Sequence, residues 1–444
     1  MSAPKPLWQT FLRFLAPLML SNALQSLFGT VSNVYLGQMI GVDALAAVSA
    51  CFPVVFFLFA FVMGLSTGAT VLIGQAFGAG KHDGIRIVAG TTLAVGLLLS
   101  IPVALVGGLY SRQLMIALAT PTDILDQAGA YARIMLFTMP LGFVFLLMTA
   151  MIRGVGDAVA PLLALALSTA IGLILTPMLI HGAVGVTSPA WAAAISNAVT
   201  LIVLAVHLLR KKHALAPDTA LLRHIRLNRA VIGQILGIGL PSAVGMVAMA
   251  IAELVLLGLV NGYGSDATAA YGAVNQVMGY TQFTAMSISI AVSILGAQAI
   301  GGGDRTRFDR IVRTGLAFNL VLTGGLVALI CLIPRVVLGI FITDGDVLDL
   351  AKGLLLIALW SSVPFGLATT LSGAMRAAGV ALTPMLLSIF AIVAIELPSA
   401  AILSRTVGLE GVWAAYPIVF CTMFVLQMGY YLLVWRKRAI RRLA

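Results

Sequence analysis

Long apolar runs follow one another along the chain, and short polar segments separate them. Each run reaches about 20 residues or more, the length that an α-helix needs to cross a lipid bilayer. The sequence predicts twelve spanning helices, at residues 11–36, 44–76, 85–109, 127–152, 158–180, 187–209, 231–260, 267–299, 311–334, 351–375, 381–404 and 410–435. We therefore expect an all-α integral membrane protein. An even number of spans places both ends of the chain in one compartment.

The second half of the chain repeats the first at a spacing of about 223 residues. DALAA at 43–47 matches DATAA at 266–270, and RGVGDAVAP from Arg153 matches RAAGVALTP from Arg376. Six helices per copy is an even number, so both copies have the same orientation in the membrane. Transporters built from parallel repeats bind their substrate between the halves and alternate the access to it.

This repeat predicts two six-helix bundles and a basic linker between them. The bundles cover residues 1–209 and 230–444, and the linker covers residues 210–229. The linker, RKKHALAPDTALLRHIRLNR, is rich in Lys, Arg and His, which is typical of a segment on the cytoplasmic surface of a membrane protein.

Composition supports the membrane assignment and indicates an orientation. Hydrophobic residues make up 61% of the chain and charged residues 9%, against roughly 45–50% and 25% in soluble domains. Of the 26 Lys and Arg residues, 21 lie on the side that the twelve-helix topology shares with both termini. The positive-inside rule makes that side cytoplasmic, in a multi-pass protein of the inner (plasma) membrane. The net charge of +11 indicates contact with anionic lipid headgroups, and no basic patch indicates binding to nucleic acid.

The three cysteines and the motifs of common enzymes add little. Cys51, Cys331 and Cys421 lie inside apolar runs without the spacing of a zinc site or a disulfide framework. The chain has no Walker A loop, no HExxH and no GxSxG. We therefore expect no enzyme activity and no cofactor other than a coupling ion. A membrane-embedded enzyme acting on lipid is a less favoured alternative, because it would need clustered His, Asp or Ser.

Glu253 is the most informative single residue. It lies near the middle of the apolar stretch from Leu240 to Gly264, where a charged side chain costs roughly 2.5–3.5 kcal/mol on insertion scales. An acid at this depth predicts a site for a proton or a cation. Glu396 is the other deep carboxylate. It lies two residues before Pro398, which favours a structural role, so we expect it to be secondary to Glu253 in transport.

Polar faces on the predicted helices indicate a cavity, because an amide in hydrocarbon is costly unless it forms hydrogen bonds. Hydrogen bonding between helices is the alternative explanation for the same residues. Helix 1 and helix 8 each place several polar or small residues on one face, and helix 10 adds a tryptophan before a proline. The candidate cavity residues are Asn22, Gln25, Asn33, Asn275, Gly279, Gln282, Met286 and Trp360.

The chain resembles the bacterial multidrug and toxic compound extrusion (MATE) family over nearly its whole length. The resemblance is carried by Pro17 in helix 1, by GQAFGAG after helix 2, and by RGVGDAVAP and MRAAGVALTP in the two halves. It implies a twelve-helix antiporter that exports organic, often cationic, compounds in exchange for protons or sodium. It also implies that Glu253 occupies the place of a helix 7 glutamate involved in coupling. We expect a monomer.

Two departures from the family pattern change what is expected. Similar transporters usually have an aspartate in helix 1 where this chain has Asn33, and many have an acid in helix 10 near Phe365. Coupling is therefore expected in the second half. Two other transporter classes remain as alternatives: flippases for lipid-linked saccharides, which belong to the same superfamily, and the major facilitator superfamily, which has the same helix count.

Overall fold

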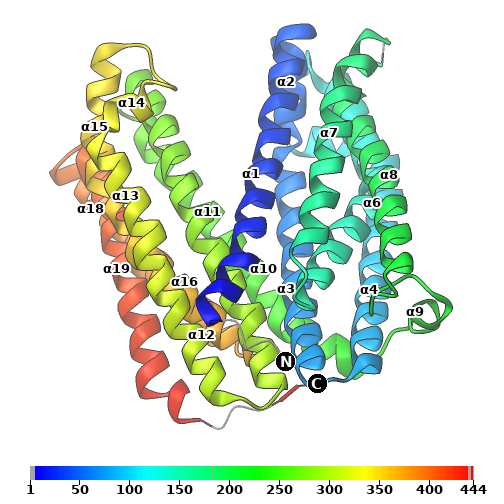
Figure 1. Cartoon of the computed structure of the whole chain (residues 1–444). Helices are drawn as coiled ribbons and strands as arrows, with labels where there is room; N and C mark the ends of the chain where they lie inside the picture. Colours follow the sequence, from blue (N-terminus) through cyan, green and yellow to red (C-terminus); the bar gives the residue numbers. More distant parts are fainter. Residues whose placement is uncertain (1–5, 183, 439–441, 444) are drawn as a thin grey trace. The chain divides into compact units, whose positions relative to one another are not determined.

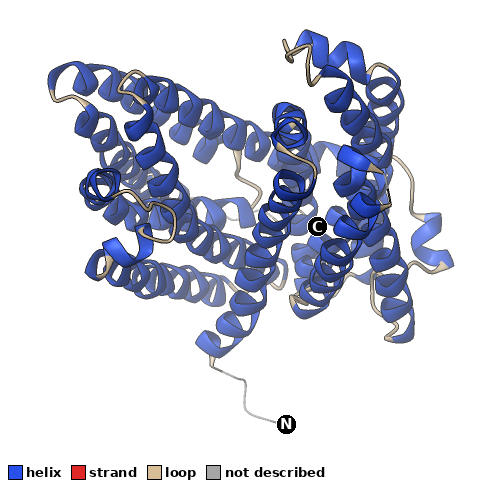
Figure 2. Ribbon diagram, turned by 90° about the horizontal axis from the view of Figure 1, so that it is seen from above, coloured by secondary structure: helices blue, strands red, loops and turns tan. Residues whose placement is uncertain are grey.

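The computed structural model describes residues 6–182, 184–438 and 442–443, and all regular structure in these residues is helical (Figures 1 and 2). Twelve helical segments are long and apolar enough to cross a membrane, which confirms the predicted count. The helices of the first half are α1 (Leu7–Met39), α2 (Val42–Ala50), α3 (Phe52–Gly78), α4 (His82–Leu109), α5 (Ser111–Ala117), α6 (Leu125–Gly154), α7 (Val159–His181), η1 (Gly185–Thr187) and α8 (Ser188–Arg210). The linker holds α9 (Thr219–Arg223).

The second half follows the same order. Its helices are α10 (Arg229–Asn261), α11 (Ser265–Gly301), α12 (Arg305–Phe318), η2 (Asn319–Thr323), α13 (Gly324–Leu332), α14 (Pro334–Leu338), α15 (Gly345–Ala358), η3 (Leu359–Ser361), α16 (Ser362–Ala377), α17 (Leu382–Phe390), η4 (Ala391–Glu396), α18 (Leu397–Thr406), α19 (Leu409–Leu433) and η5 (Trp435–Lys437).

The prediction of one continuous span at 44–76 is wrong. The segment forms two helices, α2 and α3, which meet at Cys51. Pro53 lies in the first turn of α3, and a proline cannot donate the backbone hydrogen bond that would continue the preceding helix. Three spans of the second half also contain a change of helix type, at η2, η3 and η4.

The backbone preserves the internal repeat. Among the described residues, eight glycines have a positive φ, and they form four pairs at a spacing of 223 residues: Gly41 and Gly264, Gly80 and Gly303, Gly156 and Gly379, Gly185 and Gly408. Two ion pairs recur at the same spacing. Arg112 Nε lies 3.0 Å from Asp126, and Arg335 Nη2 lies 2.6 Å from Asp349. The halves therefore share their turns as well as their order of helices.

Contacts divide the chain into two compact units. The first-half unit covers residues 16–240, and the second-half unit covers residues 241–443 together with the start of the chain as far as Leu15. Within the second-half unit, the rings of Phe11 and Phe318 lie 5.0 Å apart. Within the first-half unit, a Cβ on Gly239 would lie 2.6 Å from the Gly64 carbonyl oxygen. The helices α1 and α10 thus each begin in one unit and continue in the other.

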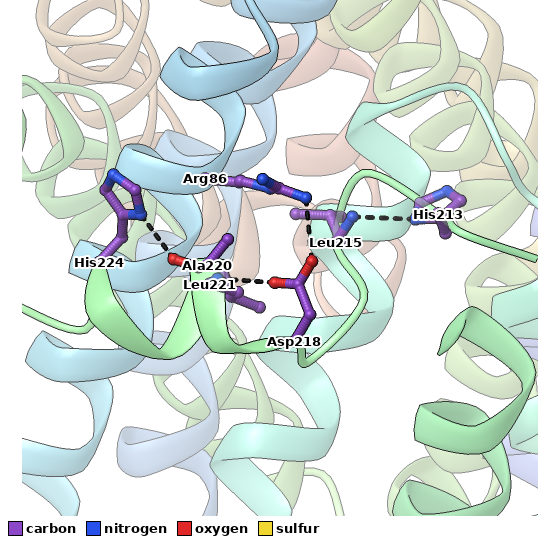
Figure 3. A network of polar contacts seen from close by, with 7 residues as sticks. All are labelled: Arg86, His213, Leu215, Asp218, Ala220, Leu221 and His224. Carbon is purple, nitrogen blue, oxygen red and sulfur yellow. Dashed lines mark hydrogen bonds and ion pairs between the residues drawn. The ribbon is translucent and has the colours of Figure 1, made fainter. Parts of the chain in front are cut away.

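The linker packs on the first-half unit through the side chains drawn in Figure 3. Asp218 accepts a hydrogen bond of 2.8 Å from the Leu221 amide and so caps α9. Its other oxygen lies 3.0 Å from Arg86 Nη2 on α4. A Cβ on Gly90 would lie 2.9 Å from the amide nitrogen of Ile225. The glycine therefore allows the linker backbone to approach α4 closely.

Candidate functional site

The second-half unit brings Glu253 and Glu396 to one small pocket of about 20 Å³. Glu253 comes from α10 and Glu396 from the end of η4. Gln282 of α11 and Tyr416 of α19 also line this pocket, and the rest of its wall is apolar. The side chain of Glu396 is 5% exposed. Three of the predicted site residues, Glu253, Glu396 and Gln282, therefore lie together, and we call this place the carboxyl pocket.

The position of Glu396 follows from Pro398. Proline has no N–H, and its ring clashes with the carbonyl four residues earlier, here that of Ala394. The chain responds with a wider, π-helical turn from Ala391 to Glu396, in which the Leu397 amide donates to the Ile392 carbonyl. Such turns inside helices are frequent at functional sites. The wide turn ends at the residue that enters the pocket.

A hydroxyl network adjoins the carboxyl pocket, and sequence reasoning missed it. The hydroxyl oxygens of Tyr271 and Tyr416 lie 3.1 Å apart. Tyr416 lies 3.5 Å from Oδ1 of Asn275, and Tyr271 lies 3.4 Å from the backbone carbonyl of Glu253. The two tyrosines are 145 residues apart in sequence. Their positions in apolar helices gave no polar pattern that could have indicated the contact.

A second cavity of the second-half unit has a volume of about 150 Å³ and contains Arg376. The same four segments that line the carboxyl pocket, α10, α11, α19 and the broken helix α17–η4, continue past it. Met249 and Met423 line both spaces. The predicted cavity residue Met286 lines this one and is 37% exposed. We call it the arginine cavity.

The first-half unit contains the largest of these spaces, about 720 Å³, which is within the range of ligand sites for small molecules. Its lining includes Asn33 and Gly29 of α1, Tyr131 of α6 and Asn197 of α8, but no Asp, Glu, Lys, Arg or His among the described residues. Ser168 donates a 3.2 Å hydrogen bond to Asn197. This first-half cavity is polar in places and uncharged.

The remaining predicted cavity residues are more scattered. Asn22 is partly buried on α1, and Gln25 is exposed. Gly279 is partly buried on α11, between Asn275 and Gln282. Trp360 lies in η3 and is 48% exposed. The polar face of α11 thus passes the tyrosine network, the carboxyl pocket and the arginine cavity in turn, at Asn275, Gln282 and Met286.

Comparison with known proteins gives the family. The MatE family model matches residues 17–178 and 241–402, one match in each repeat. The chain is 39% identical over 443 residues to a probable multidrug resistance protein, YoeA, of Bacillus subtilis, and the match covers 98% of this chain and 96% of that protein.

More distant matches agree. The chain is 24% identical to a probable multidrug resistance protein, NorM, of Thermotoga maritima, over 96% of this chain and 92% of that protein. A crystal structure of MATE in complex with MaL6 has a TM-score of 0.87 at 23% identity and covers 95% of each chain. Since the family model matches most of the chain, the protein belongs to the MATE family of multidrug efflux transporters.

Proposed function

We propose that this transporter, which is not an enzyme, exports small organic cations from the cytoplasm by alternating access, in exchange for a proton or a sodium ion held at Glu253 and Glu396. The names of its relatives, multidrug resistance and multidrug export proteins, support small-molecule export. The observation that carries the coupling site is the shared pocket of the two carboxyls, together with the uncharged lining of the first-half cavity.

The chemistry of exchange follows from the setting of the two carboxyls: Glu396 is buried, and Glu253, which lines the same pocket, is exposed. A carboxylate in an apolar pocket is costly unless a proton, a cation or hydrogen bonds neutralise it. A proton entering from outside removes the charge, and a cationic substrate arriving from the cytoplasm stabilises it. The two ligands therefore compete. Each shifts the balance between inward-facing and outward-facing states by the difference in its affinity for them.

Proton coupling is the version that we favour over sodium. The carboxyl pocket has a volume of about 20 Å³, room for about one water molecule, and a proton on a carboxyl needs none of the several oxygen ligands that surround a bound metal cation. The described lining offers Glu253, Glu396, Gln282 and Tyr416 as oxygen donors. Transport in proteoliposomes, under a proton gradient and a sodium gradient imposed separately, distinguishes the two ions.

Glu253→Gln is the decisive variant. It mimics the protonated carboxyl permanently, so we expect normal assembly, weaker cation binding with little dependence on pH, and loss of export against a gradient. Substrate affinity measured in detergent from about pH 5.5 to about pH 8.5 tests this. If the variant keeps the pH profile of the native protein, Glu253 has no part in coupling. Glu396→Gln is the companion variant, and we expect it to retain part of the activity and lose some stability.

We also propose that the linker and both termini are cytoplasmic, in the inner membrane of the cell. The two ends of the chain fall on residues 1–5 and 444, outside the described residues. A version without Cys51, Cys331 and Cys421 would receive a single cysteine at Lys211 or at Pro121, which are both exposed. An impermeant thiol reagent applied to intact cells should label position 121 only. Labelling at 211 alone would reverse the orientation.

A further inference from the structure

The arginine cavity holds a cation without an anionic partner. Arg376 lies in the last turn of α16. Its Nη1 donates a 3.2 Å hydrogen bond to Ser372 and its Nη2 a 3.0 Å hydrogen bond to Ser289. Its Nε is buried and has no hydrogen-bond partner. Within the described part of the chain, no carboxylate lies within 4.0 Å of the guanidinium.

An arginine in this setting requires an explanation. Guanidinium has five N–H donors and stays charged, and a charge within a membrane segment is normally paired or faces water. Two neutral serines satisfy only part of this demand. The serines do fix the plane of the guanidinium, because Ser289 also donates a 2.6 Å hydrogen bond to the Thr369 carbonyl. The group is therefore held in place with donors left over.

The corresponding position of the first half has an acid nearby in sequence. Arg376 corresponds to Arg153 in the repeat, and Asp157, four residues after Arg153, corresponds to Val380. Asp157 accepts hydrogen bonds of 2.9 and 3.0 Å from the amides of Val159 and Ala160 at the start of α7. Among the described residues Arg153, like Arg376, has no carboxylate within 4.0 Å. The two arginines differ in that Arg376 lines the arginine cavity, whereas Arg153 does not line the first-half cavity.

The rest of the cavity wall suits an apolar body. Five methionines line it, at positions 246, 249, 286, 385 and 423, together with Phe365 and Ile290. Methionine is flexible and polarisable and adapts to ligands of irregular shape. Gln427, which is 1% exposed, also lines the cavity. Its Nε2 donates to the Pro384 carbonyl at 2.8 Å, and its Oε1 is buried without a partner.

We propose that the arginine cavity binds the carboxylate of a small organic anion, with the anion's apolar body against the methionines. A guanidinium and a carboxylate match as two parallel hydrogen bonds. A volume of about 150 Å³ is about five times the share of one water molecule in liquid, enough for a carboxylate on a single ring. The binding of this anion does not depend on the proposed export of cations.

Benzoate is the probe, and the purified full chain in detergent is the sample. Equilibrium dialysis with radiolabelled benzoate should show saturable binding. Benzamide, which has the same shape without the charge, should compete at least about tenfold more weakly. Acetate and chloride, which lack the ring, should also compete weakly. Equal binding of benzoate and benzamide would contradict the proposal that Arg376 recognises the ligand's charge. Equal competition by chloride and benzoate would contradict the proposal that the methionines bind an apolar body.

Variants locate the site. Arg376→Lys keeps the charge but loses the planar fork, so benzoate affinity should fall at least about tenfold. Arg153→Lys makes the same change at the matched position of the first half and should leave benzoate affinity unchanged. Ser372→Ala removes only a neighbour that orients Arg376 and should give a smaller loss. Each variant is first shown by gel filtration and thermal melting to be folded. Equal losses for the two arginine variants would contradict the proposal.

A transport assay separates this inference from the proposed function. If proteoliposomes show no cation export driven by protons or sodium, but benzoate binds at Arg376, the exchange mechanism falls and the anion site stands. If cation exchange proceeds and benzoate does not bind, the anion site alone is wrong.

Discussion

The two halves of this protein share their turns and differ in their interiors. The first half encloses a cavity of about 720 Å³ whose described lining carries no charge. The second half encloses smaller spaces of about 150 and 20 Å³, and these hold Arg376, Glu253 and Glu396. Positions that fix the backbone match between the halves, while the residues that line the interior spaces differ. On the proposed function, the first half supplies a cavity large enough for a small molecule, and the second half supplies the charged side chains.

The shared part is set by backbone geometry. The four glycine pairs with positive φ lie at turns of the chain, where other residues are strained. The paired ions Arg112–Asp126 and Arg335–Asp349 are exposed and contribute at most about 1 kcal/mol each. They are better explained as features inherited with the turn than as sources of stability.

One packing contact between helices differs between the halves. In the second half, a Cβ on Gly366 would collide with the side chain of Asn319. Asn319 is fully buried, donates a 3.1 Å hydrogen bond to the Val363 carbonyl and accepts a 3.0 Å bond from Thr323. The corresponding residues of the first half are Gly96, for Asn319, and Phe143, for Gly366. In the first half the glycine is therefore on the other helix, and a Cβ on Gly96 would lie 2.5 Å from the side chain of Leu147.

Gly366→Ala should therefore destabilise the protein more than any other change considered in this comparison. The added methyl group must displace a hydrogen-bonded amide from a packed contact, and overpacking of this kind costs about 1–3 kcal/mol. Thermal melting in detergent measures the loss.

Gly325→Ala is the matched control for that variant. Gly325 lies on α13, just after the π turn that contains Asn319, and a Cβ there would meet no atom within 4 Å. Alanine should be neutral or slightly stabilising at this position, since glycine in a helix costs up to about 1 kcal/mol relative to alanine. Similar melting temperatures for the two variants would show that Asn319 can move to accommodate the added methyl group.

The sequence predicted the parts of this structure that depend on local pattern. Apolar runs gave the twelve spans, and the repeat aligned Arg153 with Arg376. The sequence did not show that Arg376 lacks an acid partner, because this depends on which helices surround the arginine. The sequence did not predict the tyrosine network for the same reason, since Tyr271 and Tyr416 meet only when α11 and α19 pack together.

Glu253 and Glu396 show what local sequence pattern can predict and what depends on how the helices pack. Each was identified from its depth in an apolar run. Their common pocket depends on the π turn before Pro398, and helical periodicity cannot place a side chain beyond a turn of altered pitch. The break between α2 and α3 was missed although Pro53 signalled it, because no charged residue interrupts the apolar run around Cys51.

Asn33→Asp restores a charge to the interior that lacks one, and so tests whether the halves are divided in their roles. Asn33 lines the first-half cavity. A carboxylate there should raise the affinity for a cationic dye such as ethidium about tenfold, which corresponds to about 1.4 kcal/mol. Fluorescence titration at low and high salt measures this.

Gln25→Glu provides the control for that experiment. It adds the same charge to the same helix at an exposed position that is not part of the cavity lining. A gain confined to Asn33→Asp would place the dye in the first-half cavity. Equal gains for both variants would reduce the effect to general attraction of cations, and no gain would show that cations bind elsewhere.

The smallest expected effect concerns the linker, which packs on the first-half unit. The Nδ1 of His213 accepts a 3.2 Å hydrogen bond from the Leu215 amide, so the ring must be unprotonated at that nitrogen (Figure 3). Burial lowers the pKa of His213, and the charges of His207 and Lys211 lower it further, against an opposing effect of Asp157. The folded linker therefore favours the neutral ring.

The sign of the pH effect follows from that lowered pKa. Above the ordinary histidine pKa of about 6.5, the ring is neutral whether the linker is packed or not, and stability does not change. As pH falls below this value, the unpacked linker takes up a proton that the packed one resists, so packing is lost progressively.

Hydrogen exchange of the Leu215 amide should become faster between about pH 6.5 and 5 in the native protein. His213→Gln should abolish that dependence. His224→Gln is the control, because His224 Nδ1 contacts the Ala220 carbonyl at 2.7 Å, a contact that requires a proton on the ring and survives protonation. If exchange at Leu215 has the same pH profile in the native protein and in His213→Gln, the linker is held by Arg86 and Asp218 alone.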